Sequence, residues 1–73
     1  MFKKEKVEEI KKRFPAGTRF VVNRMNDDPD PVEPGTCGTV ELVDDIGTIH
    51  CRFDNGRHIG VIPGVDQFRR IKD

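Results

Sequence analysis

Four side chains in this sequence are of the types that bind zinc. Cys37, His50, Cys51 and His58 supply two thiols and two imidazoles, which are common ligands of that ion. Their spacing argues against a shared ion, because His50 and Cys51 are adjacent and neighbouring residues of a strand point to opposite faces. The chain has no Cys-x-x-Cys or His-x-x-x-His pair. We therefore expect no metal site and no other cofactor, and we expect both cysteines to be reduced.

Nucleophilic catalysis has little support in the sequence. It needs a Cys or Ser beside a His and an orienting acid, but the chain has no serine and Cys51 is predicted to point inward. A glycine-rich phosphate loop is absent, and 73 residues leave little room for a substrate pocket. We therefore expect a protein that is not an enzyme.

A basic strip on one predicted hairpin is the first candidate binding site. Its members are His50, Arg52, Arg57 and His58. Such a strip would suit nucleic acid. However, 13 Lys and Arg balance 13 Asp and Glu, which removes the attraction of the whole domain for polyanions. The chain also has no Trp or Tyr on which bases could stack.

An acidic segment from 25 to 34 is the second candidate, with Asp27 and Asp28 as its binding residues. It contains three prolines and no basic residue, so we predict a long exposed loop. Pro29 and the lack of a central glycine argue against a calcium loop. An acidic rim of this kind attracts basic residues in SH3-type peptide binders, although the aromatic groove of those domains has no counterpart here.

The N-terminal residues predict an amphipathic helix. Val7, Ile10 and Phe14 recur at spacings of three and four, which places them on one side of a helix. Basic residues fill its last turn, where the helix dipole favours cations. Pro15 ends it. We expect the apolar side to pack on the rest of the chain.

From residue 18 the pattern changes to short β-branched and aromatic runs separated by Gly, Pro, Asn and Asp. We predict strands near 18–24, 38–43, 48–53, 57–62 and 68–71. Pro63 prevents a longer fourth strand, and a single helical turn is expected before the fifth. This order predicts a mostly β domain over 1–73: an SH3-like five-stranded barrel over 15–73 with an N-terminal α-helix over 1–14.

The register of the central hairpin can be argued from its turn, Asp54-Asn55-Gly56. A two-residue Asn-Gly turn would mix apolar and charged residues on both faces. A three-residue turn, with Gly56 at positive φ, gathers the apolar residues on one face. Its cross-strand pairs are Cys51 with Ile59 and Ile49 with Val61. The outward face then holds His50, Arg52 and His58, with Gly60 opposite His50.

Several motifs also resemble an uncharacterised family of small proteins from Gram-positive bacteria, phages and conjugative elements. They run from Pro15 to Ile71. The motifs are Pro15-x-Gly-Thr-Arg19, Pro34-Gly-Thr-x-Gly-Thr-Val40, Val43-Asp-Asp-Ile-Gly-Thr-Ile-His50, Phe53-Asp-Asn-Gly56 and Ile62-Pro-Gly-x-Asp66. The resemblance implies an SH3-like fold and a mobile-element setting, and it brings no activity or site residue with it. Phe53 stands where similar sequences are expected to have Trp.

These observations predict a non-enzymatic interaction module. We expect it to bind a protein, including a second copy of itself, and nucleic acid is the alternative partner. No run approaches the ~20 apolar residues that span a bilayer, so we expect a cytoplasmic protein without a membrane partner.

Overall fold

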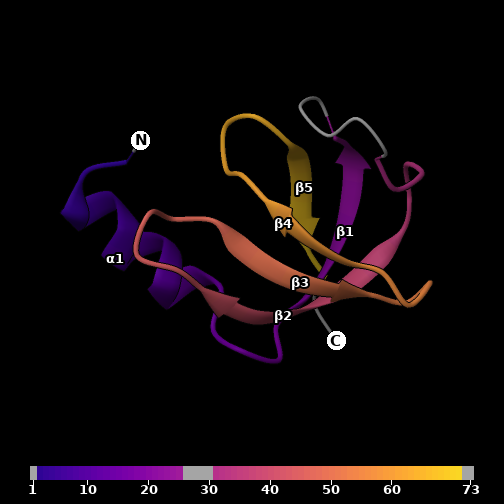
Figure 1. Ribbon diagram of the computed structural model, residues 1–73, viewed down its shortest axis with the longest axis horizontal. Coiled ribbons are helices and arrows are strands. Elements are labelled where there is room, and N and C mark those ends of the chain that lie inside the picture. Colours follow the sequence, from indigo (N-terminus) through magenta and orange to yellow (C-terminus); the bar gives the residue numbers. More distant parts are fainter. Residues whose placement is uncertain (1, 26–30, 72–73) are drawn as a thin grey trace.

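The computed structural model describes residues 2–25 and 31–71, which form one helix followed by five strands (Figure 1). The elements, in chain order, are α1 (Lys4–Arg13), β1 (Arg19–Arg24), β2 (Cys37–Val43), β3 (Ile49–Phe53), β4 (His58–Val61) and β5 (Gln67–Arg70). The predicted mostly β chain with an N-terminal helix is therefore confirmed. Each strand end lies within one residue of its predicted position.

All five strands belong to one antiparallel sheet in the order β4-β3-β2-β1-β5. The two outer strands, β4 and β5, are not paired with each other, so the sheet is open. The predicted barrel is therefore not confirmed. One reason lies in the connection between these strands, where Pro63 has no N–H to donate and the chain turns away after Val61.

The core lies on the inward face of the sheet. Burial alternates strictly along β3, where the first, third and fifth residues are buried, as expected for a strand with one face in the core. The Phe20 and Phe53 rings meet edge to face with centroids 5.5 Å apart. The most deeply buried side chains are Phe20, Phe53, Ile49, Val22, Val40, Val61 and Cys51.

The segment between β1 and β2 differs from its prediction. Met25 and Val32 are 8% and 3% exposed and belong to the core, so the ends of this segment are anchored rather than solvent-exposed. The burial of these two apolar side chains holds the chain against the core at positions 25 and 32. Asp27 and Asp28 lie outside the described residues.

Helix α1 packs against the end of the sheet at which β2 turns into β3 (Figure 1). Val7 and Ile10 are buried, and the Phe14 ring lies edge-on to Phe68 with centroids 5.5 Å apart. The predicted apolar side of the helix is thus confirmed. At the turn, a Cβ on Gly47 would lie only 2.6 Å from the Phe2 ring, so the missing side chain allows the N-terminal segment to approach.

The turn between β4 and β5 is not the predicted helical turn. Ile62 O accepts the N–H groups of Val65 and Asp66 at 3.1 and 2.9 Å, but Gly64 has a φ of +86°. A right-handed helix excludes that conformation. Proline followed by a glycine at positive φ is typical of a type II β-turn. Asp66, 6% exposed, closes the turn by accepting the Ile62 N–H at 3.0 Å.

Two glycine substitutions test the docking of the N-terminal segment. Gly47→Ala and Gly56→Ala both place a side chain at a φ near +90°, which costs roughly 1–2 kcal/mol in each case. Only position 47 also meets the Phe2 ring, since a Cβ at Gly56 has open space around it. We expect Gly47→Ala to lose about 1–2 kcal/mol more in urea unfolding because of overpacking.

A Phe2→Ala change in the Gly47→Ala background should recover most of that difference. Equal losses in Gly47→Ala and Gly56→Ala would show that Phe2 does not pack on the turn.

Candidate functional site

The central hairpin has the predicted three-residue turn. Its register pairs Cys51 with Ile59 and His50 with Gly60, and Gly56 adopts a φ of +91°. The Phe53 N–H donates to Arg57 O at 2.8 Å to close the loop. The alternation of side chains on this hairpin is therefore confirmed.

Three of the predicted site residues share the outward face of this hairpin. His50, Arg52 and His58 are all exposed, and Arg52 and His58 lie directly opposite each other. Arg57 does not join them. It is half-buried and lies opposite the buried Phe53, so strand alternation sends its side chain to the other side. Asp27 and Asp28 cannot be placed relative to this face because they lie outside the described residues.

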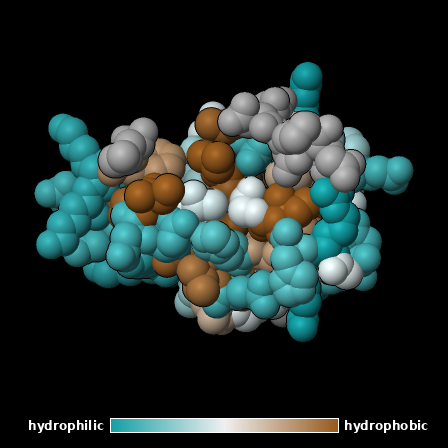
Figure 2. Space-filling model, viewed as in Figure 1, coloured by the Kyte–Doolittle hydropathy of each residue, from teal (hydrophilic) through white to brown (hydrophobic). Residues whose placement is uncertain are grey.

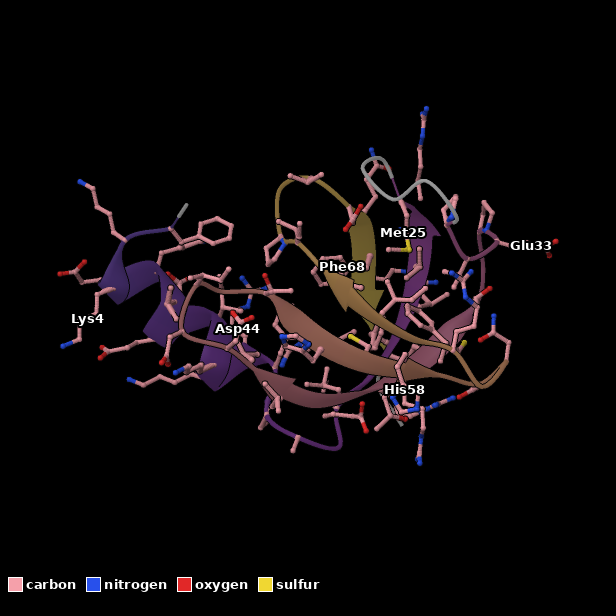
Figure 3. All side chains as sticks on the ribbon, viewed as in Figure 1. Lys4, Met25, Glu33, Asp44, His58 and Phe68 are labelled. Atoms are coloured by element: carbon pink, nitrogen blue, oxygen red, sulfur yellow. The ribbon has the colours of Figure 1, made fainter. Side chains whose placement is uncertain are left out.

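Each histidine on the outward face is hydrogen-bonded to a carboxylate. His50 Nε2 lies 2.8 Å from Asp44 Oδ2, and His58 Nδ1 lies 3.1 Å from Glu41 Oε1. Asp44 and His58 are labelled in Figure 3, at the two ends of the β2–β3–β4 part of the sheet. Both carboxylates come from β2 or its following turn, and neither was predicted. The position of Glu41 depends on a register shift in β2.

That shift is a β-bulge between Val40 and Leu42. Val40 pairs with Cys51, whereas Leu42 pairs with His50, so one extra residue, Glu41, lies between them. A bulge of this kind turns the following side chains relative to those before it. It brings Leu42 to the outward face, where its side chain is 53% exposed.

A further ion pair continues the outward face onto β1. Arg19 donates to both carboxylate oxygens of Asp54 at 2.8 Å and to Thr39 Oγ1 at 3.0 Å. The hydrogen bonds from Arg19 hold the pKa of the Asp54 carboxyl below its usual value. The cross-strand pairs place one residue from each of four strands in a single row, which consists of Arg19, Thr39, Arg52 and His58.

An open hollow of about 570 Å³ lies over β2, β3 and β4. Its lining includes the outward-facing Leu42, His50, His58 and Glu41, together with Ile59, whose side chain faces inward. Gly60 contributes no side chain, and the Thr48 methyl group lies 2.8 Å from the position that its Cβ would take. Figure 2 shows that apolar surface occurs on the viewed side of the molecule as small patches among hydrophilic residues.

Asp44 organises the turn beside this hollow. Its Oδ1 accepts the N–H groups of Ile46 and Thr48 at 3.1 and 2.9 Å, while Oδ2 faces His50. Burial tends to raise the pKa of the Asp44 carboxyl, but the hydrogen bonds from His50, Thr48 and Ile46 outweigh it and hold this pKa below its usual value.

The two cysteines do not converge with the histidines. Cys51 is 1% exposed and points into the core, where burial, with a smaller contribution from Glu41, raises its pKa to about 12. Cys37 is half-buried on β2. Within residues 2–25 and 31–71, no three His, Cys, Asp or Glu side chains are grouped as metal ligands.

The Asp44 turn predicts a pH dependence of stability. Because the folded pKa lies below the unfolded value of about 3.9, the carboxylate stabilises the fold above that pH, and this contribution disappears as pH falls through the folded pKa. We expect Asp44→Asn to lower the free energy of unfolding at pH 7 by roughly 0.5–1 kcal/mol. The difference from wild type should vanish at the acid end of a urea-unfolding series.

Asp45→Asn is the matched control, because that side chain is 98% exposed and its ion pair is with Lys11. A loss at pH 7 as large in Asp45→Asn as in Asp44→Asn would contradict the role given to Asp44.

Thiol alkylation should separate the two cysteines. A thiol that is buried and largely protonated reacts only when the fold opens. We expect Cys51 in a Cys37→Ala variant to react at least about 100-fold more slowly in buffer than in urea, whereas Cys37 in Cys51→Ala should be slowed far less. Peptide mass spectrometry measures both rates, and rapid labelling of Cys51 in buffer would refute its burial.

No helix in the described part of the chain is long and apolar enough to cross a membrane.

No curated protein and no solved structure matches the chain significantly. One family model matches residues 3–71, nearly the whole length, and its description is a domain of unknown function. This chain therefore belongs to the family described as Domain of unknown function (DUF4314).

Proposed function

We propose that this chain is a non-enzymatic interaction module that binds a protein through the outward face of β2, β3 and β4. The proposal includes an SH3-like arrangement of the open sheet. Its support is the strand order β4-β3-β2-β1-β5 together with the bulge that bends β2. The bacterial mobile-element setting, which the sequence resemblance implies, belongs to the same proposal. So does the cytoplasmic location, which is expected because no run approaches the ~20 apolar residues that span a bilayer.

The observation that carries the proposal is the exposed Leu42 beside an open hollow. Its side chain is 53% exposed, and the residues around it are the polar His50, His58 and Glu41. An apolar anchor point within a polar rim is the usual anatomy of a protein-binding surface. The two His–carboxylate pairs offer a peptide both hydrogen-bond donors and acceptors.

The charge pattern of this face favours protein over nucleic acid. Glu41 and Asp44 lie within hydrogen-bonding distance of the two histidines, and Asp54 is held by Arg19. These carboxylates would repel phosphates. The five phenylalanines are also engaged in the core or packed against it, so they offer no platform for stacked bases.

A matched pair of surface substitutions tests the proposal. Leu42 and Ile46 are both large, apolar and more than half exposed, but only Leu42 lines the hollow. We expect protein partners captured from the source cell by the wild-type chain to be lost with Leu42→Lys and retained with Ile46→Lys, because a charge at position 42 removes the apolar anchor. Capture should be unchanged by nuclease.

The nucleic-acid alternative has its own measurement. Retention on a polyanion column at physiological salt, abolished by the double change Arg52→Glu and Arg57→Glu, would reverse the proposal. Equal loss of partners with Leu42→Lys and Ile46→Lys would also count against this face.

A further inference from the structure

Strand β4 presents unpaired backbone groups on its free edge. The Phe53 N–H donates to Arg57 O, which makes this a hydrogen-bonded pair of the antiparallel ladder. Hydrogen-bonded and non-hydrogen-bonded pairs alternate, so His58 and Gly60 occupy non-hydrogen-bonded positions opposite Arg52 and His50. Their N–H and C=O groups therefore point away from β3.

Ile62 is the next residue whose backbone N–H and C=O groups could point to the free edge of β4. Both groups already have hydrogen-bond partners within the chain. The N–H of Ile62 donates to Asp66 Oδ2 at 3.0 Å, and its carbonyl accepts from Val65 and Asp66. The available edge thus narrows to the stretch from His58 to Gly60. Within residues 2–25 and 31–71, the backbone groups of these two residues have no hydrogen-bond partner at this edge.

The opposite edge of the sheet is protected. Strand β5 ends in Arg69 and Arg70, and charged side chains are a common device against edge pairing. The chain just after α1 also contacts this edge, since Phe14 packs on Phe68, and Arg70 donates to Arg13 O at 3.2 Å. Strand β4 has no lysine, no proline and no bulge.

We propose that the free edge of β4 pairs with β4 of a second copy of this chain, antiparallel about a two-fold axis at Ile59. In this register His58 lies opposite Gly60 of the partner, Ile59 opposite Ile59 of the partner and Gly60 opposite His58 of the partner. The N–H and C=O groups that His58 and Gly60 direct to the free edge then form hydrogen bonds with the same groups of the partner. His58 bonds to Gly60 of the partner, and Gly60 bonds to His58 of the partner. The two sheets become one continuous sheet.

The side chains of β4 fit this register. On the outward face, each His58 lies opposite a glycine of the partner, which brings no side chain of its own, although the Thr48 methyl group lies over that glycine. On the inward face, the half-buried Ile59, which packs at the margin of the core, meets its own copy. Apolar cross-strand pairs stabilise a sheet. The zero formal net charge of the chain adds no overall repulsion.

This interface is small, because β4 has only four residues, whereas a stable complex commonly uses about 20–30 residues a side. The dimer is therefore weak and concentration-dependent. It uses the edge of the sheet rather than the Leu42 surface, so it is independent of the proposed function. It places two copies of that surface side by side.

The first test needs no variant. Sedimentation of the wild-type chain from micromolar to millimolar concentration should show the average mass rising toward twice that of the monomer. Amide exchange of His58 and Gly60 should slow over the same range, whereas the exposed amide of Asn55 in the turn should not change. A chain that stays monomeric at millimolar concentration overturns the proposal.

The interface is located with paired variants. His58→Pro removes an edge N–H without breaking a β3 hydrogen bond, and His58→Ala keeps that N–H while also losing the contact with Glu41. We expect His58→Pro to dimerise at least about tenfold more weakly than His58→Ala. Ile59→Lys should likewise be monomeric where Ile59→Val dimerises.

Far-ultraviolet circular dichroism at low concentration checks that each variant folds. If His58→Pro does not, the Ile59 pair decides the outcome. Dimerisation of Ile59→Lys as strong as that of Ile59→Val overturns the proposal. The proposal would also be overturned if the His58 and Gly60 amides were protected only after an unrelated extended peptide is added. That result would show that the edge binds a strand of another molecule. Leu42→Lys should sediment as the wild type does.

Discussion

The placement of the β4 side chains relative to β3 depends on the turn at Asp54-Asn55-Gly56. Gly56, at a φ of +91°, allows a three-residue loop, and this loop sets β4 in register with β3. A shift of one residue would exchange the faces of β4, carrying His58 inward and Ile59 outward. The open hollow and the free edge groups of His58 and Gly60 are both consequences of this register. The backbone conformation of Gly56 thereby determines which β4 residues face the core and which face solvent.

Elements governed by local patterns were predictable from the sequence. The spacing of Val7, Ile10 and Phe14 located α1, and Asn-Gly between alternating residues located the β3–β4 hairpin. Such signals operate over a few neighbouring residues. They fix the type and approximate limits of an element, and in the hairpin they also fix which residues face outward.

Features that depend on distant residues were not predictable in this way. The bulge at Glu41 leaves no local mark in the sequence, yet it brings Leu42 outward and sets a carboxylate beside His58. The expected basic strip is consequently a mixed surface. Closure of the sheet is equally non-local, and the type II turn at Pro63 and Gly64 carries the chain from β4 to β5 without pairing them. The burial of Met25 and Val32 was not predicted either, because both residues lie in a polar segment of the sequence.

The contact between Phe2 and Gly47 links two segments that lie far apart along the chain. The helix itself is local and can form early, but its apolar side has nothing to cover it until the turn between β2 and β3 exists. During synthesis from the N-terminus, Val7 and Ile10 would therefore emerge well before their packing partners. The largely charged sequence of α1, which is mostly Lys and Glu, keeps such an unaccompanied helix in solution while the sheet is completed.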